Sequence, residues 1–321
     1  QDAVFSVAKS FDNMEEYNTF KKDFIKTSSI DANAKIEQSS KARADKTETK
    51  MSEENKTIKT ANLPVTQRSL VNDFKKIGIQ EGQVLLVHSS LSALGWVCGG
   101  PVAVVLALEE VLGETGTLVM PTFTADNSEP SYWNNPPVPE NWWTIIRAER
   151  TPFMPDLSPT RQMGKVVETF RKQAGTMRSY HPMNSFCARG KQAAFITENH
   201  GLDNGLGETS PLARLYELKA HILLLGVPHD NNTSMHLAEY RANYKKTYEK
   251  QGGAVLINGE RQWVKYDDIA LNSDDFSLIG KAFEAETEEV SIGKIGYATS
   301  RFMPQNIIVD FAVKWMEKNR R

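Results

Sequence analysis

Three polar side chains directly follow a short apolar run in this 321-residue chain. Val84–Val87 is predicted to be a buried strand, and His88, Ser89 and Ser90 lie where that strand should end. An imidazole gains or loses a proton near neutral pH, and the neighbouring hydroxyls can hydrogen-bond a ligand. The pattern therefore predicts a site for a ligand at the end of this strand.

A glycine-bearing loop and a predicted helix follow these polar residues. Gly95, Gly99 and Gly100 lie in the loop, and Pro101 begins an apolar helical pattern. A strand, a polar tip, a glycine loop and a helix N-terminus together make the usual ligand site of an open α/β sheet.

Five further polar residues lie at predicted strand ends or in glycine loops: Asp126, His181, Glu208, His236 and Glu239. The spacing of His236 and Glu239, i and i+3, places both on one face of a predicted helix. With His229 nearby they could hold a metal ion, but two residues of these types also recur at this spacing by chance.

Each of these residues also has a purely structural interpretation. His181 precedes a proline, a common arrangement in surface turns, and Glu208 could serve only to stabilise the N-terminus of the next helix. The pattern alone does not decide between these roles and catalysis.

Several familiar motifs are absent from the sequence. There is no G-x-x-x-x-G-K-[ST] phosphate loop, no G-x-G-x-x-G after a strand and no G-x-S-x-G nucleophile elbow. A net charge of −2 does not favour nucleic acid as a partner. Two cysteines, Cys98 and Cys187, fit a reducing compartment, and no apolar run is long enough to cross a membrane. We therefore expect a cytoplasmic protein.

The order of the expected strands and helices, which position these residues, predicts an α/β fold. Apolar runs indicate strands at 83–88, 117–120 and 221–226, with hairpin-like pieces at 253–258 and 261–265. Helices are expected at 68–77, 101–112, 164–172, 192–199, 211–218, 233–241, 275–285 and 304–318. The β-loop-α-β order favours a parallel sheet, and so long an irregular stretch as 122–160 is usually functional.

The first part of the chain has a different composition. Residues 27–59 are mostly Ser, Thr, Asn, Lys and Glu, which cannot offset their ordering entropy by burial. We expect residues 1–58 to be a disordered N-terminal extension and 59–321 to be one enzyme domain. Met51, just ahead of the first patterned segment, is a candidate for the natural start.

Six ordered motifs resemble the aminoglycoside 3-N-acetyltransferase family, and in particular its Bacillus-type members. They begin with Val87-His-Ser-Ser-Leu-Ser-Ala-Leu-Gly-Trp-Val-Cys-Gly-Gly100, Gly116-Thr-Leu-Val-Met-Pro-Thr122 and Ser158-Pro-Thr-Arg-Gln-Met-Gly164. They continue with Arg178-Ser-Tyr-His-Pro182, Leu206-Gly-Glu-Thr-Ser-Pro-Leu212 and Thr233-Ser-Met-His-Leu-Ala-Glu239. The resemblance covers about residues 60–318 and implies a three-layer, open, twisted and mostly parallel sheet, distinct from the GNAT acetyltransferases.

The resemblance also implies a reaction. Acetyl-CoA would be the acetyl donor, and the 3-amino group of a 2-deoxystreptamine aminoglycoside the acceptor, which is an antibiotic-resistance activity. Because an aliphatic amine is mostly protonated at pH 7, direct acyl transfer needs a general base. By resemblance that base is His181, with Glu208 as its carboxylate partner.

The other site residues are also those that the resemblance implies. Acetyl-CoA would be bound by His88, Ser89, Ser90, Leu91, Gly95, Val97, Gly99, Gly100, Thr160, Arg161, Met163 and Gly164. The amine substrate would be bound by Asp126, Glu239, His236 and Asn232, and no metal ion is expected. Ser89 and Ser90 are a possible source of donors for the oxyanion.

Alternatives remain at this stage. The same fold could acetylate a different amine, or the chain could bind CoA without catalysis. The protein itself is expected to be a monomer or a homodimer. A covalent acetyl-cysteine intermediate on Cys98 or Cys187 is a further alternative, although both are expected to be packing residues.

Overall fold

The computed structural model describes residue 58 and residues 61–321, the latter within a single compact unit, Thr60–Arg321. The predicted disordered extension, residues 1–58, lies outside the described residues except for Ile58, as does the proposed start at Met51. Both stay predictions.

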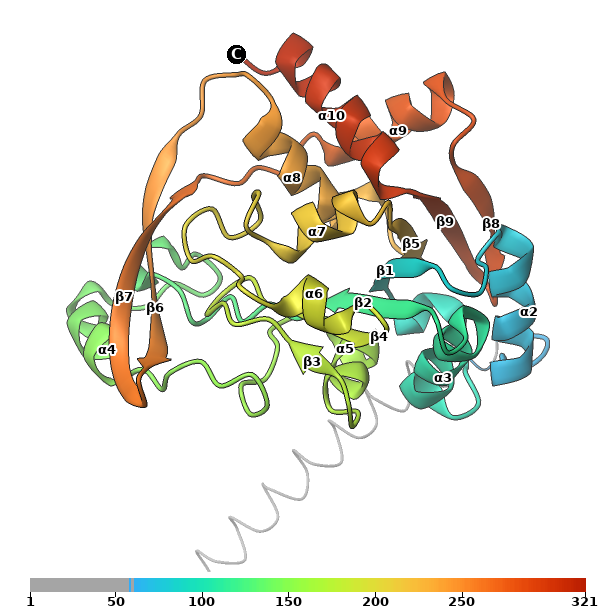
Figure 1. The fold of residues 1–321 in the computed structure, drawn as a ribbon, viewed down its shortest axis with the longest axis horizontal. Helices are drawn as coiled ribbons and strands as arrows, with labels where there is room; N and C mark the ends of the chain where they lie inside the picture. The colour runs from blue at the N-terminus through green and yellow to red at the C-terminus, as the bar shows by residue number, and fades with distance from the viewer. Residues whose placement is uncertain (1–57, 59–60) are drawn as a thin grey trace, which may run out of the picture. The chain divides into compact units, whose positions relative to one another are not determined.

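A seven-stranded sheet with the order β3-β4-β2-β1-β5-β9-β8 forms the centre of this unit (Figure 1). Its strands are β1 (Val84–Ser89), β2 (Thr117–Pro121), β3 (Met177–Arg178), β4 (Phe186–Gly190), β5 (His221–Leu225), β8 (Ser291–Ile295) and β9 (Ala298–Pro304). β1 pairs in parallel with both β2 and β5, whereas β4 and β9 run antiparallel to the strands beside them. The carboxyl ends of the three central strands therefore meet at one edge of the sheet.

Alternate residues of the central strands enter two different hydrophobic cores. Leu85 and Val87 of β1 belong to one core cluster, whereas Leu86 belongs to the other. Since successive side chains of a strand point to opposite faces, both faces of the sheet are covered and the unit has three layers.

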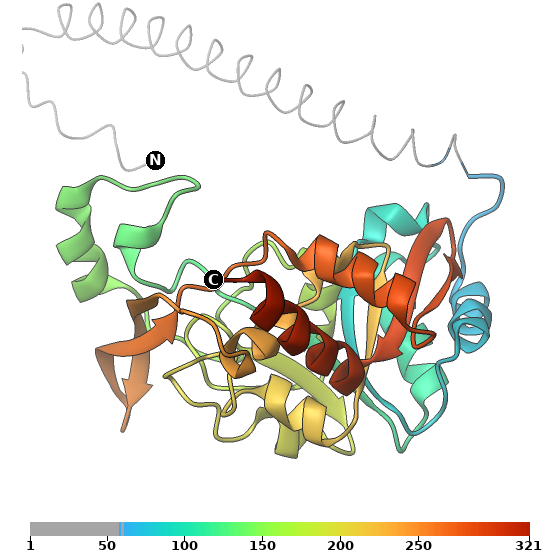
Figure 2. The ribbon, with the colours of Figure 1, turned by 90° about the horizontal axis from the view of Figure 1, so that it is seen from above.

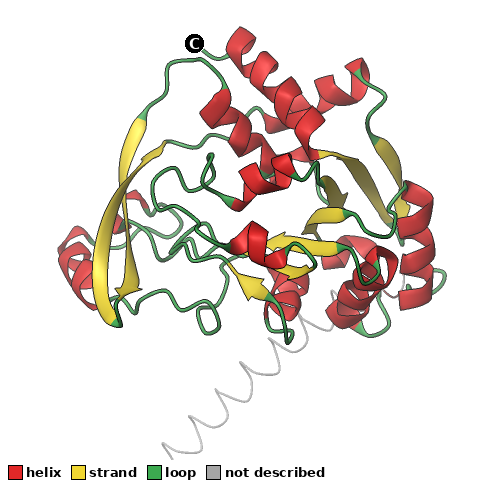
Figure 3. Cartoon of the chain, viewed as in Figure 1, coloured by secondary structure: helices red, strands yellow, loops and turns green. Residues whose placement is uncertain are grey.

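Two sets of helices provide the outer layers (Figure 3). One face is covered by α2 (Gln67–Ile77), α3 (Gly100–Leu112) and α5 (Gly164–Arg171). The other is covered by α6 (Ala193–Thr197), α7 (Pro211–Glu217), α8 (Ser234–Arg241), α9 (Phe276–Glu286) and α10 (Gln305–Asn319). Local signals fix their ends: Thr66 and Ser69 form a capping box before α2, and Gly78 ends that helix in the left-handed conformation.

A long two-stranded hairpin is separate from the main sheet. It consists of β6 (Tyr248–Ile257) and β7 (Glu260–Ile269), paired over their whole length. Figures 1 and 2 both place it on the side of α4 (Trp143–Glu149), away from the β8–β9 end of the sheet. Asn127 connects the hairpin to the loop after β2, because its amide group exchanges two hydrogen bonds with the backbone of Ala254.

The structure confirms the predicted α/β class and its three-layer open sheet. The predicted strands at 83–88, 117–120 and 221–226 are β1, β2 and β5, within one or two residues at each end. The paired antiparallel strands β8 and β9 were not predicted, and the two hairpin pieces are parts of one longer ribbon. None of the described helices is both long and apolar enough to cross a membrane.

Candidate active site

A pocket of about 200 Å³ lies at the carboxyl ends of the three central parallel strands. His88 and Ser89 line it from β1, Pro121 from β2, and Val227 just after β5. β1 lies between the next parallel strand along the chain, β2, and the later strand β5, so this is the point where the strand order reverses. Ligands bind at such points in open α/β sheets.

Residues from three other segments complete this pocket, which we call the strand-end pocket. They are Gln162, Met163 and Val167 around the start of α5, Asp230, Asn231 and Thr233 around the short helix η4 (His229–Asn231), and His236 of α8, while Phe123 adds to the wall just after β2. Gln162, Asp230, Asn231 and Thr233 were not predicted as site residues. A signal was present, because Gly226-Val-Pro-His-Asp-Asn-Asn232 is a polar loop directly after a buried strand.

His236 of α8 lines this pocket and is paired with Glu239 on the same helix. His236 Nδ1 lies 2.5 Å from Glu239 Oε2, which fits the predicted placement of both residues on one helix face. Because the carboxylate accepts the proton on Nδ1, the neutral ring keeps an unprotonated Nε2. His236 can therefore accept a proton at that second nitrogen, and its side chain is 16% exposed.

Glu239 is held in place by further donors. Its side chain is fully buried, and Oε1 accepts hydrogen bonds from Arg320 Nη1 at 2.6 Å and from the backbone N–H of Asn272 at 3.0 Å. A buried carboxylate that is paired and fully hydrogen-bonded has little freedom to turn. Glu239 thus supports His236, and the structure does not place it among the residues that line the pocket.

His181 lies outside the strand-end pocket. Its ring is fully buried; Nδ1 accepts hydrogen bonds from the backbone N–H groups of Met183 and Asn184, and Nε2 lies 3.2 Å from the carbonyl oxygen of Leu202. Burial and the neighbouring His200 hold the pKa of His181 well below its usual value. Both ring nitrogens are therefore already engaged with the backbone.

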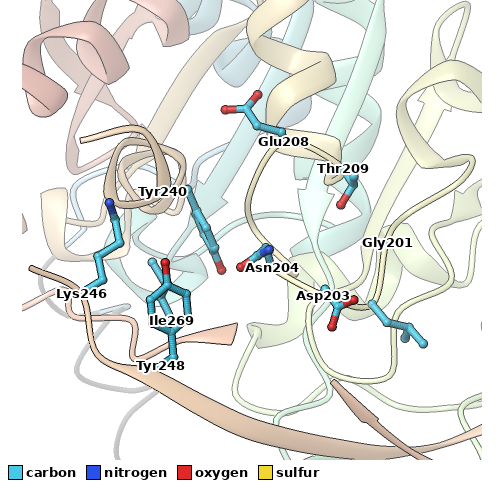
Figure 4. Close-up of a pocket in the computed structure, with 10 residues that line it drawn as sticks. Gly201, Asp203, Asn204, Glu208, Thr209, Tyr240, Lys246, Tyr248 and Ile269 are labelled. Carbon is cyan, nitrogen blue, oxygen red and sulfur yellow. The ribbon is translucent and has the colours of Figure 1, made fainter. Parts of the chain in front are cut away.

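The predicted partnership of His181 with Glu208 is not formed. Glu208 is 61% exposed in its side chain and makes two hydrogen bonds with Arg241, at 2.7 and 3.0 Å. It lines a larger pocket of about 430 Å³ together with Asp203, Asn204 and Tyr240, and Figure 4 shows its carboxylate pointing away from those three side chains. No histidine lines that larger pocket.

The residues predicted to bind acetyl-CoA are only partly brought together. His88, Ser89 and Met163 line the strand-end pocket, and Ser90 and Leu91 follow directly in the chain. Thr160, Arg161 and Gly164 lie beside Met163: Thr160 donates its backbone N–H to Glu168, Arg161 donates its own to Phe123, and Gly164 begins α5. These placements fit an acetyl-CoA site near the start of α5.

The glycine loop has a packing role that the sequence did not reveal. Val97 is buried and forms an isolated parallel β-bridge with Val65. Gly99 and Gly100 form the N-terminus of α3. A Cβ atom on Gly95 would lie 2.5 Å from the ring of Tyr297, and its φ of +88° is unfavourable for other residues.

We predict that Gly95→Ala lowers the free energy of unfolding by about 3 kcal/mol, because backbone strain and the clash with Tyr297 add. Gly100→Ala is the matched control: its φ is also positive, but nothing lies within 4 Å of the new Cβ, so a loss of about 1 kcal/mol is expected. Urea unfolding measures both. Weaker acetyl-CoA binding by a fully stable Gly95→Ala variant would instead favour the predicted nucleotide contact.

Two of the predicted substrate-binding residues are engaged elsewhere. Asp126 forms an ion pair with Arg150 at 2.7 Å in a separate pocket, and Asn232 is fully buried, where its side-chain oxygen accepts from the backbone of Ser234. Across residue 58 and residues 61–321, no three His, Cys, Asp or Glu side chains gather in a way that could hold a metal ion.

The family model for aminoglycoside 3-N-acetyltransferases matches residues 86–317. The chain therefore belongs to the aminoglycoside 3-N-acetyltransferase family, which confirms the resemblance in its motifs and the expectation of an acyltransferase. This family, whose donor is acetyl-CoA, also accounts for the fold, which is not that of the GNAT enzymes.

Individual relatives agree with this assignment. The chain is 43% identical over 265 residues to the "SPbeta prophage-derived aminoglycoside N(3')-acetyltransferase-like protein YokD" of Bacillus subtilis (strain 168), covering 82% of this chain and 97% of that protein. The crystal structure of YokD superimposes with a TM-score of 0.81. Aminoglycoside N(3)-acetyltransferase VII of Streptomyces paromomycinus is 34% identical over 279 residues, or 81% of this chain and 94% of that one.

Two further solved structures carry ligands. The structure "AAC-IIIb binary with CoASH" has a TM-score of 0.72 at 30% identity, covering 80% of this chain and 97% of that one. The structure "AAC-VIa bound to Sisomicin" has the same TM-score at 28% identity, covering 80% and 98% of the two chains.

Proposed function

We propose that this protein transfers the acetyl group of acetyl-CoA to the 3-amino group of 2-deoxystreptamine aminoglycosides, with His236 as the general base. The observation that carries the proposal is the His236–Glu239 pair at the carboxyl ends of the central strands. Family membership supports the substrates, since relatives are named for this reaction and similar structures contain CoASH or sisomicin.

The roles of the residues follow from this geometry. His236 Nε2 takes the proton from the amine nitrogen, while Glu239 fixes the tautomer and stabilises the imidazolium that forms. Asp230 is the carboxylate that lines the pocket and supplies negative charge for a cationic substrate. We assign the base to His236 rather than to His181 because both nitrogens of His181 already bond to the backbone.

A cytoplasmic location suits this chemistry. The donor contains a thioester and releases a free thiol, and Cys98 and Cys187 are themselves free thiols. Both conditions fit a reducing compartment.

A second candidate is the acetylation of a different amine. It is favoured by one observation: two of the carboxylates available for a polycationic drug, Asp126 and Glu208, are already paired with Arg150 and Arg241. An acceptor with a single ammonium group would need fewer free carboxylates.

A thiol-release assay distinguishes these functions. The protein is supplied with acetyl-CoA and, separately, with a panel of 2-deoxystreptamine aminoglycosides and a panel of simple amines. We expect thiol release with the aminoglycosides and an acetyl group on the 3-nitrogen in the product. Release only with another amine would select the second candidate, and no release with any amine would contradict both.

A further inference from the structure

His88 is a buried histidine that has no hydrogen-bond partner among the described residues, and it lines the same pocket as His236. The residue is 7% exposed, and its Nε2 is buried without a partner. Within the described part of the chain, no hydrogen bond to the other ring nitrogen is found either. Buried polar side chains are nearly always hydrogen-bonded, so a ring like this in a pocket wall indicates a partner that arrives with the ligand.

The position of His88 is fixed by the sheet. β1 pairs with β5 on one side, where His88 lies opposite Leu224, and with β2 on the other. A side chain on a central strand is placed more firmly than one on a loop. The amide side chains that line the pocket, Gln162 and Asn231, are in contrast on exposed residues.

The ring of His88 stays uncharged at neutral pH. Burial, and to a smaller extent the nearby His236, lower the pKa of His88 to about 3. A neutral imidazole carries one N–H donor and does not compete with His236 for the proton of the amine. Neutral histidines are known to polarise carbonyl groups in enzymes in this way.

Acyl transfer requires such a donor. When the amine nitrogen bonds to the thioester carbon, the carbonyl oxygen takes the electron pair of the C=O double bond and becomes an oxyanion. Because the nitrogen must also lie next to His236, the carbonyl oxygen has to lie within the same small pocket, which His88 also lines. A preorganised N–H group at that oxygen stabilises the transition state.

We propose that His88 is a further catalytic residue, whose neutral imidazole donates a hydrogen bond to the carbonyl oxygen of the bound thioester. This role rests on the proposed acetyl transfer. In the first step the C–N bond forms, and His236 takes one proton from the nitrogen. In the second step the C=O bond re-forms, the C–S bond breaks, and the thiolate of CoA leaves and takes up that proton. His88 keeps its own proton throughout.

The first test is kinetic. His88→Leu removes the donor and is expected to lower kcat by about 10²–10³-fold, with a much smaller change in KM for acetyl-CoA. His88→Gln keeps an N–H donor at this position and should recover part of the loss, which a purely structural role would not require. His88→Met replaces His88→Leu if the leucine variant does not fold. An unchanged kcat in the apolar variant would overturn the proposal.

The second test does not require an amine. Infrared spectroscopy of acetyl-CoA labelled with ¹³C at the carbonyl carbon reports the hydrogen bonding of that oxygen. In the wild-type complex we expect a carbonyl frequency below that of a thioester in an apolar solvent, and a return towards that value in the His88→Leu complex. A wild-type frequency equal to the apolar value would overturn the role of His88.

The two tests separate the inference from the proposed function. If the carbonyl frequency is lowered and depends on His88, but the protein acetylates no aminoglycoside, the role of His88 is supported. Aminoglycosides are then excluded as the acceptor. Normal acetylation of aminoglycosides by the His88→Leu or His88→Met variant would support the proposed function and overturn the role of His88. Failure of acetyl-CoA to bind the wild-type protein would overturn both.

Discussion

Replacing His236 with asparagine is expected to lower kcat for acetyl transfer by about 10²–10⁴-fold. Asparagine keeps the polarity of the site but cannot accept a proton from the amine at neutral pH. The loss corresponds to about 3–5 kcal/mol of transition-state stabilisation. Because the buried Glu239 Oε2 then loses its bond to His236, a lower thermal midpoint is expected as well, which the comparison of variants has to take into account.

Glu239→Gln tests the same pair without removing the base. The amide oxygen of the glutamine can still accept from Arg320 and Asn272, so its NH₂ group would point towards His236 Nδ1. Nδ1 would then have to be the acceptor and Nε2 would carry the proton, which is the wrong tautomer for a base. We expect a loss in kcat comparable to that of His236→Asn.

Matched variants decide between the two histidines. Glu208→Gln makes the same chemical change at an exposed carboxylate in the larger pocket and is expected to leave kcat within about twofold of wild type, since surface substitutions rarely have large effects. Initial rates of thiol release, with thermal midpoints for every variant, provide the comparison. Full activity of Glu239→Gln together with loss of activity in Glu208→Gln would contradict His236 as the base and identify His181 instead.

The sequence predicted the centre of the fold because its signals are local. Val84–Val87, the β2 segment and the β5 segment are continuous apolar runs bounded by polar or turn residues, and each can be recognised from a few positions. β8 and β9 lack such a run: Gly293 and Lys294 interrupt β8, and Arg301 interrupts β9. These two strands depend on pairing with each other and with β5, which the local sequence does not encode.

The sequence predicted where the candidate site lies better than it predicted the role of each residue in it. The strand-end residues His88 and Ser89 do line the pocket, and His236 and Glu239 were recognised as a pair on one helix face. The sequence contains no sign that two backbone N–H groups occupy His181, or that Arg241 pairs with Glu208. Such contacts join segments far apart in the chain, so only the folded structure reveals them.

Acidification is expected to destabilise the protein well above the pH at which carboxylates titrate. The pKa of His88 is lowered to about 3 and that of His200 to about 4, in both cases mainly by burial, and that of His181 lies well below its usual value. In the unfolded chain each histidine titrates near pH 6.5. Between these limits the unfolded state binds more protons, so stability is present above pH 6.5 and is lost as the pH falls.

The size of the effect follows from linkage. His88 and His200 each contribute about 1.4 kcal/mol per pH unit below pH 6.5, so these two rings together cost about 4 kcal/mol at pH 5, and His181 adds a further loss in the same direction. His221 and His229 act in the same direction, because burial also lowers their pKa values, whereas Asp268, whose pKa is raised by burial, acts against them. A domain stable by about 5–15 kcal/mol should therefore approach unfolding near pH 5.

Urea unfolding at intervals between pH 7.5 and pH 4.5 measures this slope. Glu168 does not obscure this slope: hydrogen bonds to Arg171 and Thr160 outweigh its burial and lower its pKa to about 2, so its stabilising contribution is present within this window and is lost mainly below pH 4.5. His181→Gln removes one buried ring whose pKa is lowered and should make the slope smaller, even if it lowers stability at every pH. A stability that stays constant from pH 7 to pH 5 would mean that these rings are charged in the folded state. For His181 that is physically costly, because protonation of Nδ1 would oppose two backbone N–H donors inside a fully buried site.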